Sequence, residues 1–154
     1  MRYTGAMSND VDNFTGVKIA LLLGSELLII QRDDIPGLSF AGLWDFPGGG
    51  RDAGETPFEC IAREVDEELG IRLLPEIIIW QRTFPSMLEP GMIAYFMVAR
   101  ISQSDVDNVR FGDEGQGWKL MPVDQFMQLE DAVPYLKPRM QAYLDDTRQA
   151  APHA

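Results

Sequence analysis

Residues 49–71 read GGRDAGETPFECIAREVDEELGI, and this stretch decides how the rest of the chain is interpreted. Within it, four of the glutamates and one arginine stand at fixed intervals between glycines. The defined positions are Gly49, Glu55, Arg63, Glu64, Glu67, Glu68 and Gly70, with the aliphatic residues Val65 and Ile71. A multi-carboxylate metal site readily explains this concentration of oxygen donors.

The middle of this stretch is predicted to be a helix with two clear ends. Residues 56–59, Thr-Pro-Phe-Glu, form a capping box with proline at the first helical position. Gly70 supplies the stop signal. Apolar side chains at helical spacing define one buried stripe, made of Phe58, Ile61, Ala62, Val65 and Leu69. The helix is therefore expected to be amphipathic.

The acidic side chains of this helix lie away from its buried stripe. At about 100° per residue, Glu64, Glu67 and Glu68 share a sector roughly 120° from the stripe. Like charges four residues apart destabilise a helix, as do negative charges near its C-terminus, and a divalent cation removes both penalties. Oxygen-only ligands suit magnesium or manganese. Arg63 is placed to pair with Glu59 or Glu67 and hold the cluster in shape. The alternative, a merely solvated acidic face, does not explain the fixed spacing of the arginine and the glycines.

The glycines before the helix predict a close approach of the backbone to another group. Residues 44–47, Trp-Asp-Phe-Pro, are expected to be extended, and the chain is expected to turn at residues 48–50, Gly-Gly-Gly. A carbonyl there would be a further metal ligand. A tight turn without a ligand is the alternative.

The complete pattern resembles the Nudix box, which it matches at every defined position. This resemblance implies a Nudix α/β/α sandwich with a mixed β-sheet, and Mg²⁺ as the cofactor, with Mn²⁺ as a substitute. The family's metal ligands fall here on the carbonyl of Gly48 and on Glu64, Glu67 and Glu68. The structural positions of the motif fall on Gly49, Glu55 and Gly70.

The rest of the chain predicts mostly strands around the central helix. Residues 17–23 and 27–31 flank Gly24-Ser25 as a hairpin, and residues 33–42 form a loop. Further strands are expected at 73–83, with an interruption at Pro75, and at 92–101 and 118–121, and helices are expected at 123–129 and 134–146. We expect one Nudix domain over residues 14–146, a flexible N-terminal segment over 1–13 and a flexible tail over 147–154.

Composition and charge exclude several classes of protein. The 154 residues are 45% hydrophobic and 24% charged, as in ordinary globular domains. No apolar run is long enough to cross a bilayer and no signal peptide opens the chain, so a cytoplasmic location is expected. Cys60 has no histidine near it in sequence, and we expect a small, partly buried residue. The net charge of −11 argues against a DNA partner, but it is compatible with a polyphosphate that arrives as a metal complex.

The family reaction is the attack of water on a phosphorus atom, which splits a pyrophosphate bond in a nucleoside diphosphate linked to another moiety. The residues assigned to catalysis are Arg63, Glu67 and Glu114. Glu114 lies in the acidic loop 111–117 and is the candidate general base or an extra metal ligand, with a solvated loop acid as the alternative. The residues assigned to the substrate are Arg32, Arg51 and Phe46. The alternatives are ordinary surface positions for the arginines and core packing for Phe46 and Trp44.

We expect a Mg²⁺-dependent, MutT-like hydrolase of a small-molecule nucleoside polyphosphate, either a (d)NTP or a modified NTP. The alternatives are a pyrophosphatase of ADP-ribose or dinucleoside polyphosphates, an RNA-end hydrolase, and a non-catalytic nucleotide-sensing module. Residues 131–134 lack the asparagine with which MutT-type enzymes read oxidised guanine. The proline typical of ADP-ribose pyrophosphatases is not at its usual distance, and the nearest are Pro85 and Pro90. No membrane partner is indicated, and a homodimer is compatible with the sequence.

Overall fold

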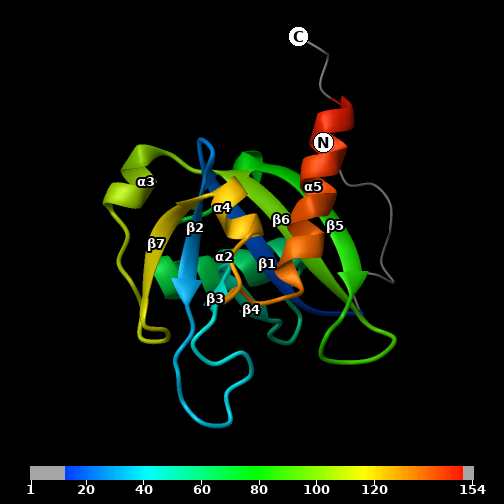
Figure 1. The fold of residues 1–154 in the computed structure, drawn as a ribbon. Helices are drawn as coiled ribbons and strands as arrows, with labels where there is room; N and C mark the ends of the chain where they lie inside the picture. The colour runs from blue at the N-terminus through cyan, green and yellow to red at the C-terminus, as the bar shows by residue number, and fades with distance from the viewer. Residues whose placement is uncertain (1–12, 151–154) are drawn as a thin grey trace.

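A seven-stranded mixed sheet forms the centre of the protein in the computed structural model, which describes residues 13–150 (Figure 1). The main path of the sheet runs through β3 (Trp44–Asp45), β2 (Glu26–Gln31), β1 (Phe14–Leu23), β6 (Ile93–Arg100) and β5 (Ile78–Pro85). Two further strands join it: β4 (Gly48–Gly50) pairs with β1, and β7 (Gly117–Pro122) pairs with β2. Strands β1 and β6 run parallel and the other pairs are antiparallel, so the predicted mixed sheet is confirmed.

Helices cover both faces of this sheet (Figure 1). Side chains alternate along β1, so Ile19 and Leu21 pack with α2 (Pro57–Leu69) on one face. Ala20 and Leu22 face the other way, into a core shared with α4 (Val123–Met127) and α5 (Leu136–Ala150). The α/β/α sandwich expected from the sequence is therefore confirmed.

The central helix begins and ends where its capping residues predict. Thr56 Oγ1 accepts from the Glu59 N–H at 3.1 Å, and the Glu59 carboxylate accepts from the Thr56 N–H at 2.9 Å. Gly70 ends the helix with φ 68°, a left-handed conformation that favours glycine. Three members of the predicted stripe, Ile61, Val65 and Leu69, are fully buried, and Phe58 and Ala62 pack against the same core. This burial fixes which side of α2 faces away from the sheet.

The expected hairpin, the loop over 33–42 and the later strands are also present, but two local predictions were wrong and one helix was not predicted. Residues 48–50 form strand β4 instead of a turn, because their backbone pairs with β1. The strand expected from Leu73 begins only at Ile78, since Pro75 opens a short 3₁₀ helix, η1 (Pro75–Ile77). The short helix α3 (Gln103–Asp107), capped by Ser102, was not predicted.

The chain ends differ partly from the expected limits. Helix α5 continues to Ala150, so residues 147–150 are helical where a flexible tail was predicted. Residues 1–12 and 151–154 of the predicted flexible ends lie outside the described residues. The domain limits stay a prediction. No helix within residues 13–150 has the length and apolar character needed to cross a membrane.

Candidate active site

Strand β4 consists of glycines, and its backbone lies in the narrow space between β1 and the acidic side of α2. A Cβ atom on Gly48 would lie 2.1 Å from the Val17 carbonyl oxygen, and φ of Gly48 is 136°. A Cβ atom on Gly49 would lie 2.7 Å from the Glu64 carboxylate. The Gly48 N–H donates to Glu68 Oε1 at 2.9 Å. Glycine is therefore required here, as expected, because the backbone touches both a strand and the box carboxylates.

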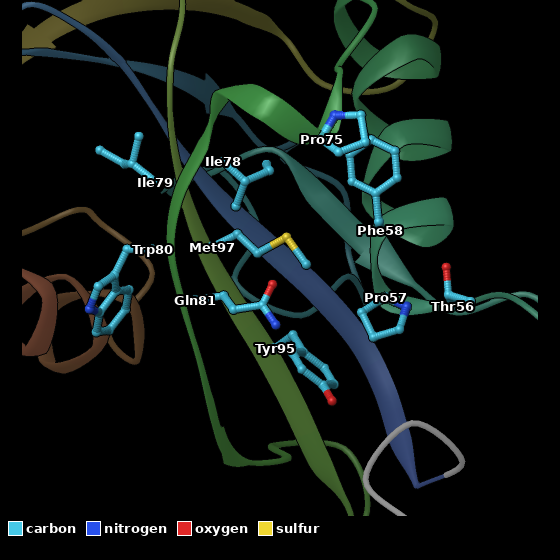
Figure 2. A pocket seen from close by; sticks show the side chains of 10 residues that line it. All are labelled: Thr56, Pro57, Phe58, Pro75, Ile78, Ile79, Trp80, Gln81, Tyr95 and Met97. Atoms are coloured by element: carbon cyan, nitrogen blue, oxygen red, sulfur yellow. The ribbon is translucent and has the colours of Figure 1, made fainter. Parts of the chain in front are cut away.

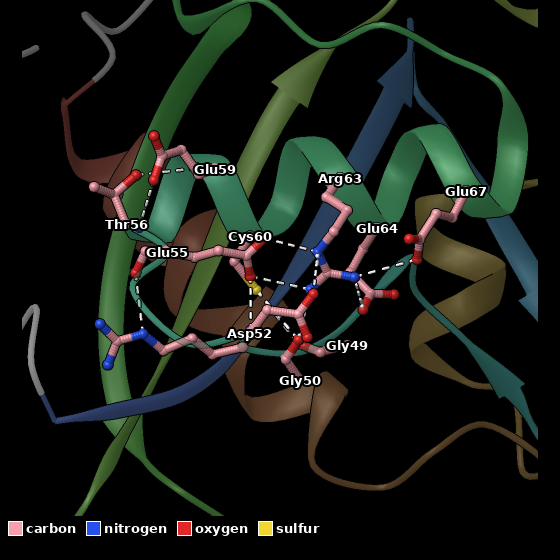
Figure 3. A network of polar contacts seen from close by, with 11 residues as sticks. Gly49, Gly50, Asp52, Glu55, Thr56, Glu59, Cys60, Arg63, Glu64 and Glu67 are labelled. Carbon is pink, nitrogen blue, oxygen red and sulfur yellow. Dashed lines mark hydrogen bonds and ion pairs between the residues drawn. The ribbon is translucent and has the colours of Figure 1, made fainter.

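Arg63 holds the elements of the box together (Figure 3). Its Nε donates to Glu55 at 2.7 Å, and its Nη1 donates to Glu64 at 2.9 Å and to Glu67 at 3.2 Å. Its Nη2 donates to the Gly50 carbonyl at 2.9 Å. The surrounding carboxylates, Glu55 first, raise the pKa of Arg63, so it stays charged. Arg63 is consequently a positioning residue that ties strand β4 to helix α2.

One predicted partner of Arg63 was wrong. The Glu59 carboxylate is used in the helix cap and does not pair with the arginine. Glu55 takes that place, in agreement with its expected structural role, and also accepts from the Asp52 N–H at 2.8 Å. Because Glu55 precedes the helix, only the folded loop brings it to Arg63.

The box glutamates fall into two environments. Glu64 and Glu68 are half-buried, and burial raises the pKa of both, that of Glu68 to about 8. The Glu67 side chain is 58% exposed and turned toward Arg63. Within residues 13–150 no three acidic, histidine or cysteine side chains already converge as a metal site. The donors, however, fit a hard divalent cation, since they are all oxygens and two are carboxylates held partly out of water beside a backbone carbonyl.

A cavity of about 430 Å³ opens beside these carboxylates. Glu64, Glu68 and Gly48 line it together with Glu114, which comes from the loop before β7. The Gly115 N–H donates to Asp33 at 3.1 Å and holds this loop over the cavity. The structure thus brings the predicted base candidate to the same cavity as two predicted metal ligands, while Glu67 is not part of the lining.

A buried ion-pair cluster that lines the same cavity was missed by sequence reasoning. Asp45 is 4% exposed and pairs with Lys18 Nζ at 2.9 Å and with Arg32 Nη1 at 3.0 Å. Burial opposes the charge on Lys18, but Asp45, with Tyr135 and Glu68, outweighs the effect of burial, so the pKa of Lys18 lies above its ordinary value. Lys18 Nζ also donates to the Gly48 carbonyl at 3.3 Å, which links this cluster to a predicted metal ligand. The available sequence signal was a lysine inside the otherwise apolar strand at residues 17–23.

The two arginines that were predicted to bind the substrate lie in different parts of the structure. Arg32 lines the cavity, as its assignment requires. Arg51 does not line it; its Nε donates to the Glu55 carbonyl at 3.0 Å and its guanidinium covers the Phe14 ring at 4.3 Å. Nothing in these contacts gives Arg51 a position at the cavity.

Phe46 belongs to the hydrophobic core. Its side chain is 1% exposed, and its ring centroid lies 4.8 Å from that of Phe126 and 6.0 Å from that of Phe96. Stacking of this ring on a nucleobase was therefore a wrong prediction, because the ring is already covered on the α4 side. Trp44 is half-buried in the same core, with Lys119 Nζ 4.4 Å from its ring.

Two further cavities adjoin the sheet. One, of about 450 Å³, shares Lys18, Arg32, Gly49 and Gly50 with the carboxylate cavity and continues along mostly apolar side chains. The other, of about 360 Å³, lies between the start of α2 and strands β5 and β6 (Figure 2). No charged side chain lines that last cavity, so it has none of the groups that phosphoryl chemistry needs.

Comparison with known proteins agrees with this geometry. The family model described as NUDIX domain matches residues 13–143. An RNA pyrophosphohydrolase from Helicobacter pylori (strain G27) is 32% identical over 124 residues, which cover 73% of each chain. The chain is thereby shown to share a family with named pyrophosphohydrolases.

Solved structures show the same fold. The MutT protein from Methanosarcina mazei Go1 superposes with a TM-score of 0.69 and 24% identity, covering 88% of this chain and 94% of that one. A bifunctional NMN adenylyltransferase/ADP ribose pyrophosphatase from Francisella tularensis, complexed with AMP and a manganese ion, has a TM-score of 0.70 and 19% identity, covering 87% of this chain and 42% of that one. The motif, the sandwich and the matched residues together show that this chain belongs to the Nudix family and is a Nudix hydrolase.

Proposed function

We propose that this Nudix hydrolase cleaves a pyrophosphate bond of a nucleoside polyphosphate, a (d)NTP or a modified NTP, and depends on Mg²⁺, with Mn²⁺ as a substitute. One observation carries the proposal. The cavity beside α2 is lined both by the carboxylates of Glu64, Glu68 and Glu114 and by the cations Lys18 and Arg32. Carboxylates and cations in one cavity suit a metal-bound polyphosphate, because the metal can bind the carboxylates while the phosphates accept from the cations.

The proposed chemistry follows from these groups. Gly48, Glu64, Glu67 and Glu68 would hold the divalent ion, which polarises phosphoryl oxygens and lowers the pKa of a bound water. Arg63 keeps Glu64 and strand β4 in register, and its removal would loosen the whole donor set. Glu114 faces the cavity and would take a proton from the attacking water, with Glu67 as the alternative base. Arg32 would contact a phosphate, although Asp45 now occupies one of its donors.

The 5′-triphosphate end of RNA is a second candidate substrate. The observation that favours it is the 32% identity to an RNA pyrophosphohydrolase over most of both chains. The net charge of −11 weighs against a long RNA, because binding along a phosphate backbone relies on basic surface. The same reaction centre would serve either substrate, and only the walls beyond the phosphates would differ.

A substrate screen tests the proposal directly. We would incubate the full chain with (d)NTPs, 8-oxo-dGTP, ADP-ribose, diadenosine polyphosphates and a short 5′-triphosphate RNA, with Mg²⁺, Mn²⁺ or a chelator, and measure the release of products by anion-exchange chromatography. Chelator-sensitive release from nucleoside triphosphates is the expected result. Release only from RNA would favour the second candidate, and a nucleotide that binds but yields no product after long incubation with manganese would indicate a non-catalytic sensing module.

Two variants link turnover to the assigned donors. Glu67→Gln and Glu68→Gln should abolish metal-dependent turnover while the chain stays folded, because an amide is a much weaker ligand for a hard cation. Glu76→Gln, at an exposed position in η1, is the matched control. Retained turnover in both box variants would contradict the assigned metal site. Cytoplasmic location, the domain limits 14–146 and a homodimer stay predictions.

A further inference from the structure

Helix α5 carries a buried arginine with no acidic partner. Arg139 is 5% exposed and lines the cavity of about 450 Å³ that adjoins the carboxylate cavity. Its one hydrogen bond runs from Nη2 to the Pro85 carbonyl at 3.3 Å. Its guanidinium carbon also lies 4.6 Å from the Tyr135 ring centroid and 5.2 Å from that of Phe84. Within residues 13–150 it makes no ion pair, and burial lowers its pKa.

The other cations of this cavity are already satisfied. Lys18 and Arg32 both pair with Asp45, so each of these cations has an acidic partner inside the protein. A guanidinium has several N–H donors, and Arg139 uses only one of them for a hydrogen bond within residues 13–150. A buried charge with unused donors is unfavourable unless something accepts them. The cavity is where such an acceptor can be supplied.

The walls around Arg139 suit a flat, largely apolar ring. Phe40 and Tyr135 lie with ring centroids 6.0 Å apart, and Met87 and Leu88 add apolar surface. The cavity shares Gly49 and Gly50 with the carboxylate cavity, so one ligand can reach both. Its phosphates would lie beside α2 and its base would lie beneath α5.

We propose that Arg139 determines substrate specificity by selecting guanine nucleotides, through donation to O6 and N7 of the base. This inference rests on the proposed hydrolysis of nucleoside polyphosphates and names their base. The planar fork of arginine matches two adjacent acceptors, and guanine is the base that presents O6 and N7 side by side. Adenine offers an amino donor beside N7, cytosine offers an amino donor, and 8-oxoguanine carries a proton on N7, so each leaves an arginine donor unmet. The cavity therefore favours guanine over both adenine and oxidised guanine.

A binding measurement without metal or turnover tests this selection. Isothermal titration calorimetry of the full chain with GMP, AMP, 7-deaza-GMP and 8-oxo-GMP, in chelator, should show GMP binding about 10-fold or more tightly than the other three, the discrimination expected of a bidentate arginine contact. The analogue 7-deaza-GMP removes only the N7 acceptor and keeps the shape of the ring. Affinities within about twofold of one another, or no binding of GMP, would overturn the proposal.

Variants of the arginine provide the reciprocal test. Arg139→Met should remove the preference for GMP over 7-deaza-GMP, and Arg139→Lys should reduce it, since lysine lacks the fork. Arg148→Met is the matched control, because Arg148 lies on the same helix with a 75% exposed side chain. If Arg139→Met does not fold, the comparison of ligands on the unmodified chain still decides. Equal kcat/KM for the triphosphates of all bases, together with equal affinity for their monophosphates, would refute the role of Arg139 but not the hydrolase function. A guanine preference in binding without any turnover would refute only the hydrolase function.

Discussion

Replacement of Gly49 by alanine should impair the reaction without unfolding the protein. The new Cβ atom would lie 2.7 Å from both Cδ and Oε1 of Glu64, whereas ordinary contacts begin at 3.4 Å. The carboxylate must therefore move by about 0.7 Å, the difference between 3.4 and 2.7 Å. Because this is the free end of a flexible side chain, the fold can accommodate the shift. A misplacement of about 1 Å in a catalytic group lowers rates by about 100-fold, so we expect turnover to fall by about 10- to 100-fold.

The neighbouring glycine should give the opposite outcome. A Cβ atom on Gly48 would lie 2.1 Å from the Val17 carbonyl oxygen and 2.8 Å from Lys18 Cα, which are backbone atoms of β1. They cannot move without breaking the β1–β4 pairing, and φ of 136° adds strain of about 1–3 kcal/mol for a residue with a side chain. Gly48→Ala should thus lower the free energy of unfolding by about 3 kcal/mol or more.

Urea unfolding followed by tryptophan fluorescence, together with turnover under saturating Mg²⁺, separates the two effects. Gly117→Ala is the control, because a Cβ atom there meets nothing within 4 Å and its φ is not in the left-handed region. Unchanged turnover in Gly49→Ala, or unchanged stability in Gly48→Ala, would refute the reasoning that β4 is a spacer of fixed width between β1 and α2.

Three other consequences follow from the same geometry. Arg63→Lys should reduce turnover and lower the free energy of unfolding by about 1–3 kcal/mol. The reason is that an ammonium group cannot replace the planar guanidinium that joins Glu55 to the Gly50 carbonyl. A thermal denaturation curve equal to that of the unmodified chain would contradict this. Burial raises the pKa of the Cys60 thiol from 9.0 to about 12, so it should not react with Ellman's reagent at pH 8 until the protein is unfolded. Between those two pKa values the folded state keeps a proton that the unfolded state releases. This thiol should therefore lower the free energy of unfolding as the pH rises from about 9 to 12, which denaturant titrations at several pH values would measure. Asp45→Asn should lower the free energy of unfolding by about 3 kcal/mol, because it leaves Lys18 charged and buried, and an equal midpoint in urea would exclude a structural role for the pair.

Much of the local structure could be read from the sequence, because short-range rules decide it. The cap at Thr56 and the stop at Gly70 act on their own helix, and both were confirmed. The spacing of the motif also predicted that Glu64 and Glu68 share one side of the helix, and the structure places both at one cavity, while their role as metal ligands stays a prediction. Agreement of that kind comes from spacing along one helix, which the sequence states directly.

Predictions failed where a partner distant in sequence decided the outcome. Residues 48–50 became a strand because β1 lies beside them, and Phe46 became a core residue because α4 covers it. Helical spacing correctly pointed to Glu67 as a partner of Arg63, but it could not point to Glu55, which precedes the helix and replaces Glu59 as the other expected partner. None of the contacts that overturned a prediction is encoded by the local pattern.

By itself, then, the sequence determined the Nudix helix, its capping and the family, since each depends on neighbours along the chain. Only the tertiary structure decided which charged side chains have an oppositely charged partner and which do not. Asp45 pairs with both Lys18 and Arg32 from a different strand, while Arg139 on the last helix is buried beside a cavity and has no acidic partner within residues 13–150. The physical reason is that burial and charge pairing depend on distances in space, and these exist only once the sheet and its two helical layers have packed.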